Sequence, residues 1–281
     1  MGPTARIARV CPVMLWAGLA TAAAQTEPAE LGVGAELVIA VDISRSIDPD
    51  EQLIQRQGYA AAFRSKDVQD AIMHGGWGRV AITYVEWAGE PIQNIIIPWT
   101  LIDSADAAHG FADRIEQGSP RSASRTSISG VISFSAEMFE QNGYTGLRRV
   151  IDVSGDGPNN QGRGVTEARD AALMRGITIN GLPLMTNGRR EAAFGFGRWS
   201  TIANLDAYYA DCVIGGPGAF AIPVTAWDQF ANAVRQKLVL ELAGRQPPQP
   251  ERLIQAQARM PIDCLIGEKM RAERQRDLGR D

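Results

Sequence analysis

Short apolar runs alternate with longer helical patterns along most of this chain, and this alternation constrains the fold more than any other feature. The apolar runs have the length and composition typical of buried strands. Strands separated by helices of this length predict a mostly parallel α/β sheet with helices on both faces. The predicted strands are Leu37–Ile43, Val80–Trp87, Ile92–Trp99, Val150–Ser154, Ile177–Leu184 and about Ala219–Pro223.

One pair of strands departs from the parallel pattern. Only a few residues separate Val80–Trp87 from Ile92–Trp99, which is hairpin spacing and predicts an antiparallel strand at the edge of the sheet. The first helix has a clear start, because Asp48 and Glu51 stand at capping-box spacing around Pro49. We expect this helix to run to about residue 73, and further helices at about 104–116, 127–141, 164–175 and 225–243.

The first 24 residues have the features of a signal peptide. Arg6 and Arg9 supply the positive region, Val10–Ala20 a short apolar region, and Ala22–Ala24 the small residues before a cleavage site. A membrane anchor is the alternative, but the apolar run is too short to span a bilayer comfortably. We therefore expect residues 1–24 to be removed and the mature protein to be periplasmic or secreted, without stable membrane insertion.

Charge and cysteine content agree with an exported binding or structural protein. The formal net charge is −4 and no basic stripe is present, which argues against nucleic acid as a partner. Cys11 leaves with the signal peptide, so Cys212 and Cys264 remain. In an oxidising compartment they predict a disulfide, with two separate buried thiols as the alternative.

The composition changes after Gly244. Arg245–Pro250 reads as a linker, and residues 245–281 as a C-terminal linker and tail that the predicted disulfide tethers. Charged residues dominate Gly267–Asp281, which predicts a solvated helix or a frayed tail.

Oxygen-bearing side chains gather where the first strand ends. Asp42, Ser44 and Ser46 stand at alternate positions there, and ligand sites in parallel α/β sheets lie at the carboxyl ends of strands. One carboxylate and two hydroxyls, without nitrogen or sulfur, suit hard cations such as magnesium, manganese or calcium. The sequence therefore predicts a divalent-metal site at this strand end.

The DxSxS pattern resembles the metal-ion-dependent adhesion site (MIDAS) of von Willebrand factor A (vWA) domains. That family adds a threonine before a helix and an aspartate after the fourth strand, and Thr126 and Asp156 stand at the matching places. The resemblance covers about residues 35–244 and implies a Rossmann-like vWA fold with six strands in the order 3-2-1-4-5-6. The chain as a whole is most similar to a proteobacterial family of exported vWA-like proteins.

The resemblance also implies roles for these side chains. Ser44, Ser46 and Thr126 would bind the ion directly, and Asp42 and Asp156 would act largely through water. Mg²⁺ is the expected ion, with Mn²⁺ or Ca²⁺ as alternatives. The expected partner is a protein or peptide ligand that offers an acidic side chain to the metal.

The sequence departs from the family pattern at two places. Arg125 precedes Thr126 where the family often has glycine, and Asp152 inside the fourth strand is a rival to Asp156. Taken singly, the serines could be ordinary loop residues, Thr126 a helix cap and Asp156 a turn residue. Five matching oxygens together favour the metal site.

Two other functions remain as alternatives. A metal-dependent hydrolase is one, although His74 and His109 stand on separate segments and the chain has neither a GxSxG nor a GxxxxGK[ST] motif. A metal-independent envelope scaffold with a vestigial site is the other.

Overall fold

The computed structural model describes residues 30–186, 201–243 and 262–278, together with Gly2. Its main sheet has the strand order β4-β3-β2-β6-β7. Central β2 pairs in parallel with β3 and β6, β7 pairs in parallel with β6, and β4 runs antiparallel to β3 at the edge. The strands are β2 (Glu36–Asp42), β3 (Val80–Trp87), β4 (Gln93–Ile102), β6 (Arg149–Gly155) and β7 (Ile177–Pro183). The predicted α/β fold class and its antiparallel edge hairpin are confirmed.

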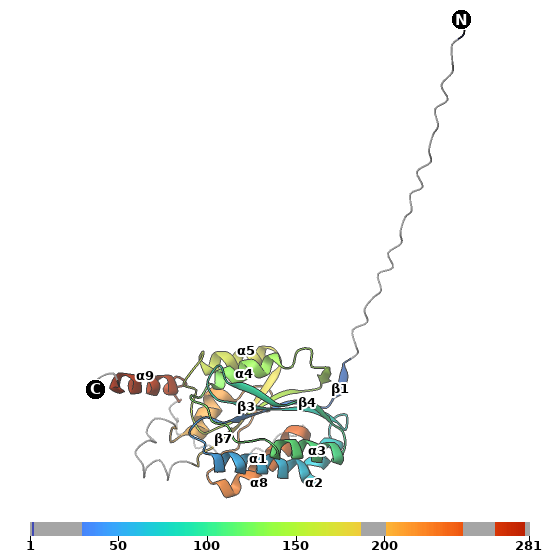
Figure 1. Ribbon diagram of the computed structural model, residues 1–281, viewed down its shortest axis with the longest axis horizontal. Coiled ribbons are helices and arrows are strands. Elements are labelled where there is room, and N and C mark those ends of the chain that lie inside the picture. The colour runs from blue at the N-terminus through green and yellow to red at the C-terminus, as the bar shows by residue number, and fades with distance from the viewer. Residues whose placement is uncertain (1, 3–29, 187–200, 244–261, 279–281) are drawn as a thin grey trace, which may run out of the picture.

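Helices cover both faces of this sheet (Figure 1). On one face lie α4 (Ile128–Glu137) and α5 (Val165–Met174). The short α7 (Leu205–Tyr208) and the π-helical turn η3 (Tyr209–Val213) share their hydrophobic core. On the other face lie α1 (Pro49–Arg64), α2 (Lys66–Met73), α3 (Ala105–Glu116) and α8 (Phe230–Ala243), which the 3₁₀ turn η4 (Trp227–Gln229) precedes.

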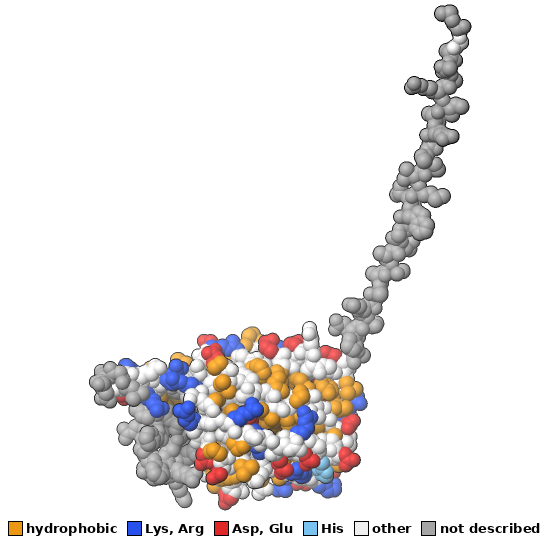
Figure 2. Space-filling model, viewed as in Figure 1, with side chains coloured by type: hydrophobic (Ala, Val, Ile, Leu, Met, Phe, Trp, Pro, Cys, Tyr) orange, Lys and Arg blue, Asp and Glu red, His pale blue; other side chains and the backbone are white. Residues whose placement is uncertain are grey.

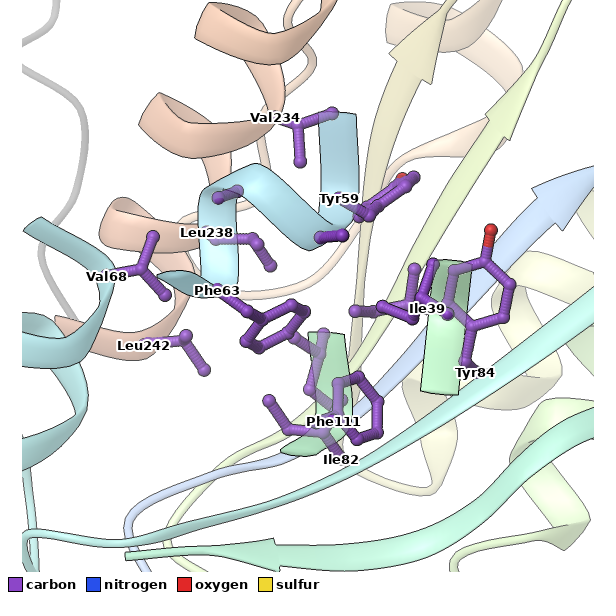
Figure 3. Close-up of a cluster of buried hydrophobic side chains, with 14 of the residues drawn as sticks. Ile39, Tyr59, Phe63, Val68, Ile82, Tyr84, Phe111, Val234, Leu238 and Leu242 are labelled. Atoms are coloured by element: carbon purple, nitrogen blue, oxygen red, sulfur yellow. The ribbon is translucent and has the colours of Figure 1, made fainter. Parts of the chain in front are cut away.

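Aromatic side chains fill the core beneath α1 and α8 (Figure 3). Tyr59 packs edge-on against Tyr84 of β3, with ring centroids 5.7 Å apart. Phe63 packs against Phe111 of α3 at 4.9 Å. All four side chains are buried. Aromatic packing of this kind holds helices firmly on the central strands, so the loop after β2 starts from a rigid base.

The predicted long first helix is divided in two. Ser65 has an extended backbone, with φ −74° and ψ 143°, and it ends α1 and caps α2. Its hydroxyl accepts the N–H of Val68 at 3.4 Å and donates to the carbonyl of Ala62 at 2.6 Å. The helical pattern continues across Ser65, which is why the sequence predicts one helix where two exist.

The predicted sixth strand is only partly present. Ala221 and Val224 form isolated bridges with Gly181 of β7 and with Leu184, the residue after β7. Ile222 and Val224 donate to the carbonyls of Gly181 and Pro183, but Pro183 has no N–H to donate in return, so the ladder is interrupted there. The described part of the main sheet therefore has five strands instead of six.

Two further elements lie at opposite ends of the molecule (Figure 1). A small parallel pair joins β1 (Leu31–Val33) to β5 (Tyr144–Gly146). At the other end lies α9 (Ile266–Leu278). The predicted signal peptide, except for Gly2, and the predicted linker Arg245–Pro250 lie outside the described residues. In the described part of the chain, no helix has the length and apolarity that crossing a bilayer requires.

Candidate metal centre

The candidate site begins at the carboxyl end of β2. Asp42, the last residue of this central strand, is fully buried. The N–H of Ser44 donates to Asp42 Oδ1 at 2.6 Å, which turns the chain sharply after the strand. The hydroxyls of Ser44 and Ser46 then lie 3.1 Å apart. The alternate spacing of these residues therefore puts two hydroxyl oxygens beside each other above the buried carboxylate.

Asp156 reaches the same place from the neighbouring strand. It follows β6, which runs parallel to β2, so the carboxyl ends of the two strands meet at one edge of the sheet. Ser46 Oγ donates to Asp156 Oδ1 at 2.8 Å. Four of the five predicted residues are thus joined by a chain of hydrogen bonds.

Thr126 approaches from the loop before α4. Its N–H donates to Asn160 Oδ1 at 3.0 Å, and its carbonyl accepts the N–H of Asn160 at 2.8 Å. The helix cap is Ser127, whose hydroxyl accepts the N–H of Gly130 at 3.1 Å. Thr126 is therefore not the cap of α4. It borders the same cavity, of about 390 Å³, as Ser44 and Ser46.

The carboxyl groups of Asp42 and Asp156 lie close enough to repel each other when both are charged. Burial raises the pKa of Asp42 well above its ordinary value, and the nearby Asp156 raises it further, while the N–H of Ser44 acts in the opposite direction. Asp42 Oδ2 is buried and accepts no hydrogen bond from the described residues. A cation held between the loops would offset both charges.

Gly155 keeps the space beside this oxygen open. A Cβ atom at Gly155 would lie 3.1 Å from Asp42 Oδ2 and 3.0 Å from Tyr209 Oη. Such contacts are tighter than side chains normally make. Glycine at the end of β6 therefore lets the strand pass close to the Asp42 carboxylate.

The donors fit a hard divalent cation. Three neutral hydroxyls and two carboxylates are the ligand chemistry of magnesium, manganese or calcium. Among the described residues, no three His, Cys, Asp or Glu side chains are grouped as a metal site of another kind. The structure thus brings together all five residues that the sequence predicts, and their role as ligands stays a prediction.

Asp152, the rival candidate, lies elsewhere. It is buried in β6, and its Oδ1 lies 2.8 Å from Nζ of Lys237 on α8. Lys237 also pairs with Glu241, which accepts a hydrogen bond from Asn180 at 2.8 Å. Asp152 therefore belongs to a buried charge cluster between the sheet and α8, and not to the loops that carry Ser44 and Ser46.

Arg125 has an unusual backbone conformation. Its φ is +80°, in the left-handed region that favours glycine. Glycine, which the resemblance leads one to expect before Thr126, would adopt this φ without strain. An arginine there carries backbone strain, and Arg125 borders the cavity next to Thr126.

The C-terminal tail is attached beside the site. The predicted disulfide between Cys212 and Cys264 is present and links η3 to the residues before α9. Asn159 Nδ2 donates to Glu268 Oε1 at 2.7 Å. A Cβ at Gly267 would lie 2.1 Å from the carbonyl oxygen of Asn159, so only glycine permits this close approach. The start of α9 is therefore held against the rest of the protein by these contacts.

Sequence reasoning missed the part that α9 plays at the site. Arg271 and Arg274 of α9 border the cavity that Ser44, Ser46 and Thr126 also line. The charge of the tail indicated only a solvated helix. The sole sequence signal for docking was Cys264, which fixes one end of the tail without showing which way the helix runs.

Comparisons with known proteins support the fold. A family model described as "Protein of unknown function (DUF1194)" matches residues 32–246. No curated protein matches the chain. Among solved structures, BatB from Bacteroides thetaiotaomicron is 19% identical, with a TM-score of 0.51, over 75% of this chain and 100% of that chain.

Proximal thread matrix protein 1 from the mussel byssus is also similar. It is 14% identical, with a TM-score of 0.53, and the match covers 76% of this chain and 48% of that one. A second structure of it, described as having a zinc-occupied MIDAS motif, is 15% identical, with a TM-score of 0.50, over 76% of this chain and 49% of that one. This chain thus spans about half the length of the mussel protein, and at such identities the likeness shows the vWA-like fold alone.

Proposed function

Because the chain belongs to the DUF1194 family of proteins of unknown function, its activity must be inferred from the site, and we propose that it binds an anionic ligand through a divalent cation. The observation that carries the proposal is the meeting of three loops. Ser46 lies between Ser44 and Asp156 in one chain of hydrogen bonds, and Thr126 faces the same cavity.

Each of the five residues has a role in this proposal. The hydroxyls of Ser44, Ser46 and Thr126 bind the ion directly. Asp42 and Asp156 balance its charge from the base of the site, largely through water. Mg²⁺ is the favoured ion, and Mn²⁺ or Ca²⁺ fit the same donors.

The donor set also explains why the ligand is anionic. Neutral hydroxyls leave a bound cation poor in electrons, and the ion supplies a coordination position for an oxygen from outside. A carboxylate fills this position well, because the metal offsets the energetic penalty of removing its charge from water. An acidic side chain of a protein or peptide is therefore the proposed ligand group.

Calorimetric titration of the metal tests the proposal. Mg²⁺ or Mn²⁺ is titrated into the wild-type protein, the Asp42→Asn variant and the control variant Asp106→Asn. Asp106 is an exposed residue in the first turn of α3 and does not border the cavity. We expect saturable heat for the wild type and the control, and at least tenfold weaker binding for Asp42→Asn, because the buried carboxylate that balances the ion is gone.

Equal heats in all three proteins would contradict the proposal, and so would negligible heats in all three. Thermal unfolding without metal shows whether Asp42→Asn keeps its fold. Asparagine has nearly the same shape as aspartate and removes a buried charge, so we expect the metal-free variant to be at least as stable as the wild type.

The two alternatives predict other results. A metal-dependent hydrolase turns over phosphoester or peptide substrates in the presence of Mg²⁺, and Asp42→Asn abolishes the turnover. A metal-independent scaffold captures its partner equally well with and without EDTA. The vWA-like fold, usually a binding and adhesion module, favours the binding function.

Export is also part of the proposed function. The disulfide between Cys212 and Cys264 supports an oxidising compartment, because such bonds are rare in the reducing cytosol. We therefore place the binding event in the periplasm or outside the cell.

A further inference from the structure

The cavity above the candidate metal centre has a charge opposite to that of the whole protein. The chain has a formal net charge of −4. Among the described residues that border the cavity, four are nevertheless arginines and none is acidic. The arginines are Arg45, Arg125, Arg271 and Arg274. Figure 2 shows Lys and Arg side chains gathered at the end of the molecule where α9 lies. A concave cationic surface on an acidic protein favours an anionic ligand.

The structure holds two of these arginines in place from a separate element. The disulfide, the hydrogen bond from Asn159 to Glu268 and the close approach of Gly267 fix the first turn of α9. Arg271 follows one turn later, and its Nη1 donates to the carbonyl of Asn160 at 3.0 Å. Arg274 is three residues further along and therefore lies on the same face of the helix. Both arginines border the cavity because the tail is docked.

Arg271 retains capacity for a ligand. Its Nε is buried and has no hydrogen-bond partner among the described residues. A guanidinium group offers parallel N–H donors that match the two oxygens of a carboxylate. Arg274 is exposed and borders the same cavity. Arg271 and Arg274 can therefore bind a negatively charged group other than the one that coordinates the metal ion.

Arg125 supplies an independent reason for the same conclusion. It adopts a φ of +80°, where glycine would be unstrained, and it borders the cavity next to Thr126. Backbone strain of this kind costs free energy and is concentrated at functional sites. Arginine at this position adds positive charge beside the predicted metal ligands.

We propose that the cavity contains a second anion subsite, formed by Arg271 and Arg274 of the disulfide-anchored helix α9, so that the ligand carries two neighbouring carboxylates. One carboxylate binds the metal and the other binds the arginines. This inference rests on the proposed function. The two carboxylates come from adjacent acidic side chains of a peptide or from a free dicarboxylic acid. A cavity of about 390 Å³ is within the size range of ligand pockets.

The test compares ligands that have one or two carboxylates. Wild-type protein saturated with Mg²⁺ is titrated with two end-blocked peptides, Gly-Gly-Asp-Gly-Gly and Gly-Asp-Asp-Gly-Gly, and with acetate and succinate. We expect the peptide with two acids to bind about tenfold more tightly than the peptide with one, as for one added charge-assisted contact. Succinate that binds as tightly as the diacidic peptide identifies a free dicarboxylic acid as the ligand, and weaker succinate binding identifies a peptide.

Arginine variants show whether α9 causes the preference. Arg274→Gln is expected to reduce the preference for two acids to about twofold or less, with unchanged affinity for Mg²⁺ and for the peptide with one acid. Arg276→Gln is the matched control, because Arg276 lies on the same helix and does not border the cavity. Arg271→Gln should act as Arg274→Gln does. Arg274 is exposed, so its variant is expected to keep the wild-type unfolding temperature.

The outcomes separate this inference from the proposed function. Metal-dependent binding of both peptides with equal affinity overturns the second subsite and leaves the proposed function intact. A preference for two acids that survives Arg274→Gln and Arg271→Gln also overturns it, as does tighter binding of a phosphoserine peptide than of the diacidic peptide. Failure of every ligand to bind in the presence of Mg²⁺ overturns the proposed function together with the inference.

Discussion

At the scale of single residues, spacing and backbone geometry decide which side chains meet. The alternate positions of Asp42, Ser44 and Ser46 put all three at the end of β2 and the start of the following loop, and the hydrogen bond from the Ser44 N–H to Asp42 gives that loop its shape. These contacts are local, so the sequence pattern predicts them well. Arg125 is different, because no pattern reveals that its φ is +80°.

Arg125→Gly separates the strain at this position from its charge. Glycine adopts the left-handed region freely, so the variant should gain about 0.5–1 kcal/mol in free energy of unfolding, after allowance for the greater freedom of the unfolded chain. It should also weaken binding of the acidic peptide, since one cavity arginine is lost. Chemical denaturation and peptide titration measure the two effects.

Arg121→Gly is the control for this prediction. Arg121 is an exposed arginine of the same loop that does not border the cavity. This variant should leave the peptide affinity unchanged. A loss of both stability and peptide affinity in Arg125→Gly would show that the left-handed backbone is not strained and would remove that argument for a binding role.

At the scale of helices and strands, the elements that depend on a short local pattern were predicted correctly. Breaks within a pattern and contacts between distant segments were not. The edge hairpin of β3 and β4 follows from a short connection, and the start of α1 follows from the capping box of Asp48 and Glu51. The break at Ser65 interrupts a helical pattern that continues across it, and the missing N–H of Pro183 interrupts the bonding of residues 221–224 to β7. The docking of α9 depends on contacts more than 100 residues away in sequence, such as Asn159 with Glu268. No local pattern contains that information.

The contact between α8 and the sheet has a predictable dependence on pH. One cation, Lys237, is buried with two acids, Asp152 and Glu241. The cluster is neutral when one acid keeps its proton. Burial accordingly raises the pKa of Glu241 to about 7, with Lys237 opposing and Asp152 adding to the shift.

The sign of the effect follows from this raised value. Between the unfolded pKa of Glu241, near 4.5, and its folded value of about 7, the folded state binds more protons than the unfolded state. Stability from this group is therefore greatest below pH 4.5 and falls as the pH rises to about 7. Glu241→Gln should remove this contribution, on the order of 1–3 kcal/mol.

Denaturation of wild type and Glu241→Gln across this pH range measures the difference. The prediction concerns the stability of the wild type relative to the variant, because other groups titrate in both proteins. A difference that stays constant, or that grows in favour of the wild type as the pH rises, would contradict the assignment of the proton to this cluster.

At the scale of the whole molecule, the disulfide joins the C-terminal helix to the vWA-like body. Cys212 is a buried residue of η3, and Cys264 lies two residues before α9. The predicted metal ligands and the two arginines of α9 therefore come from parts of the chain that this bond holds together. The sequence predicts the five candidate ligands that the structure brings together, and their role as ligands stays a prediction, whereas the contribution of α9 could not be predicted.

Removal of the disulfide should release α9 without unfolding the sheet. In the double variant Cys212→Ser with Cys264→Ser, amides of residues 266–278 should exchange rapidly with solvent, while those of β2 and β6 stay protected. The free energy of unfolding should fall by about 2–4 kcal/mol. Hydrogen exchange measures both regions in one experiment, and slow exchange of α9 in the variant would show that its other contacts suffice.

The candidate metal centre requires one hard cation among the loops after β2 and β6 and before α4. Crystals of the protein soaked in Mn²⁺ test it directly through the anomalous signal of the metal. We expect a peak at about 2.1–2.2 Å from the hydroxyl oxygens of Ser44 and Ser46, with Thr126 on its other side. A well-ordered site without a peak, or a peak held by other residues, would contradict the proposed metal centre.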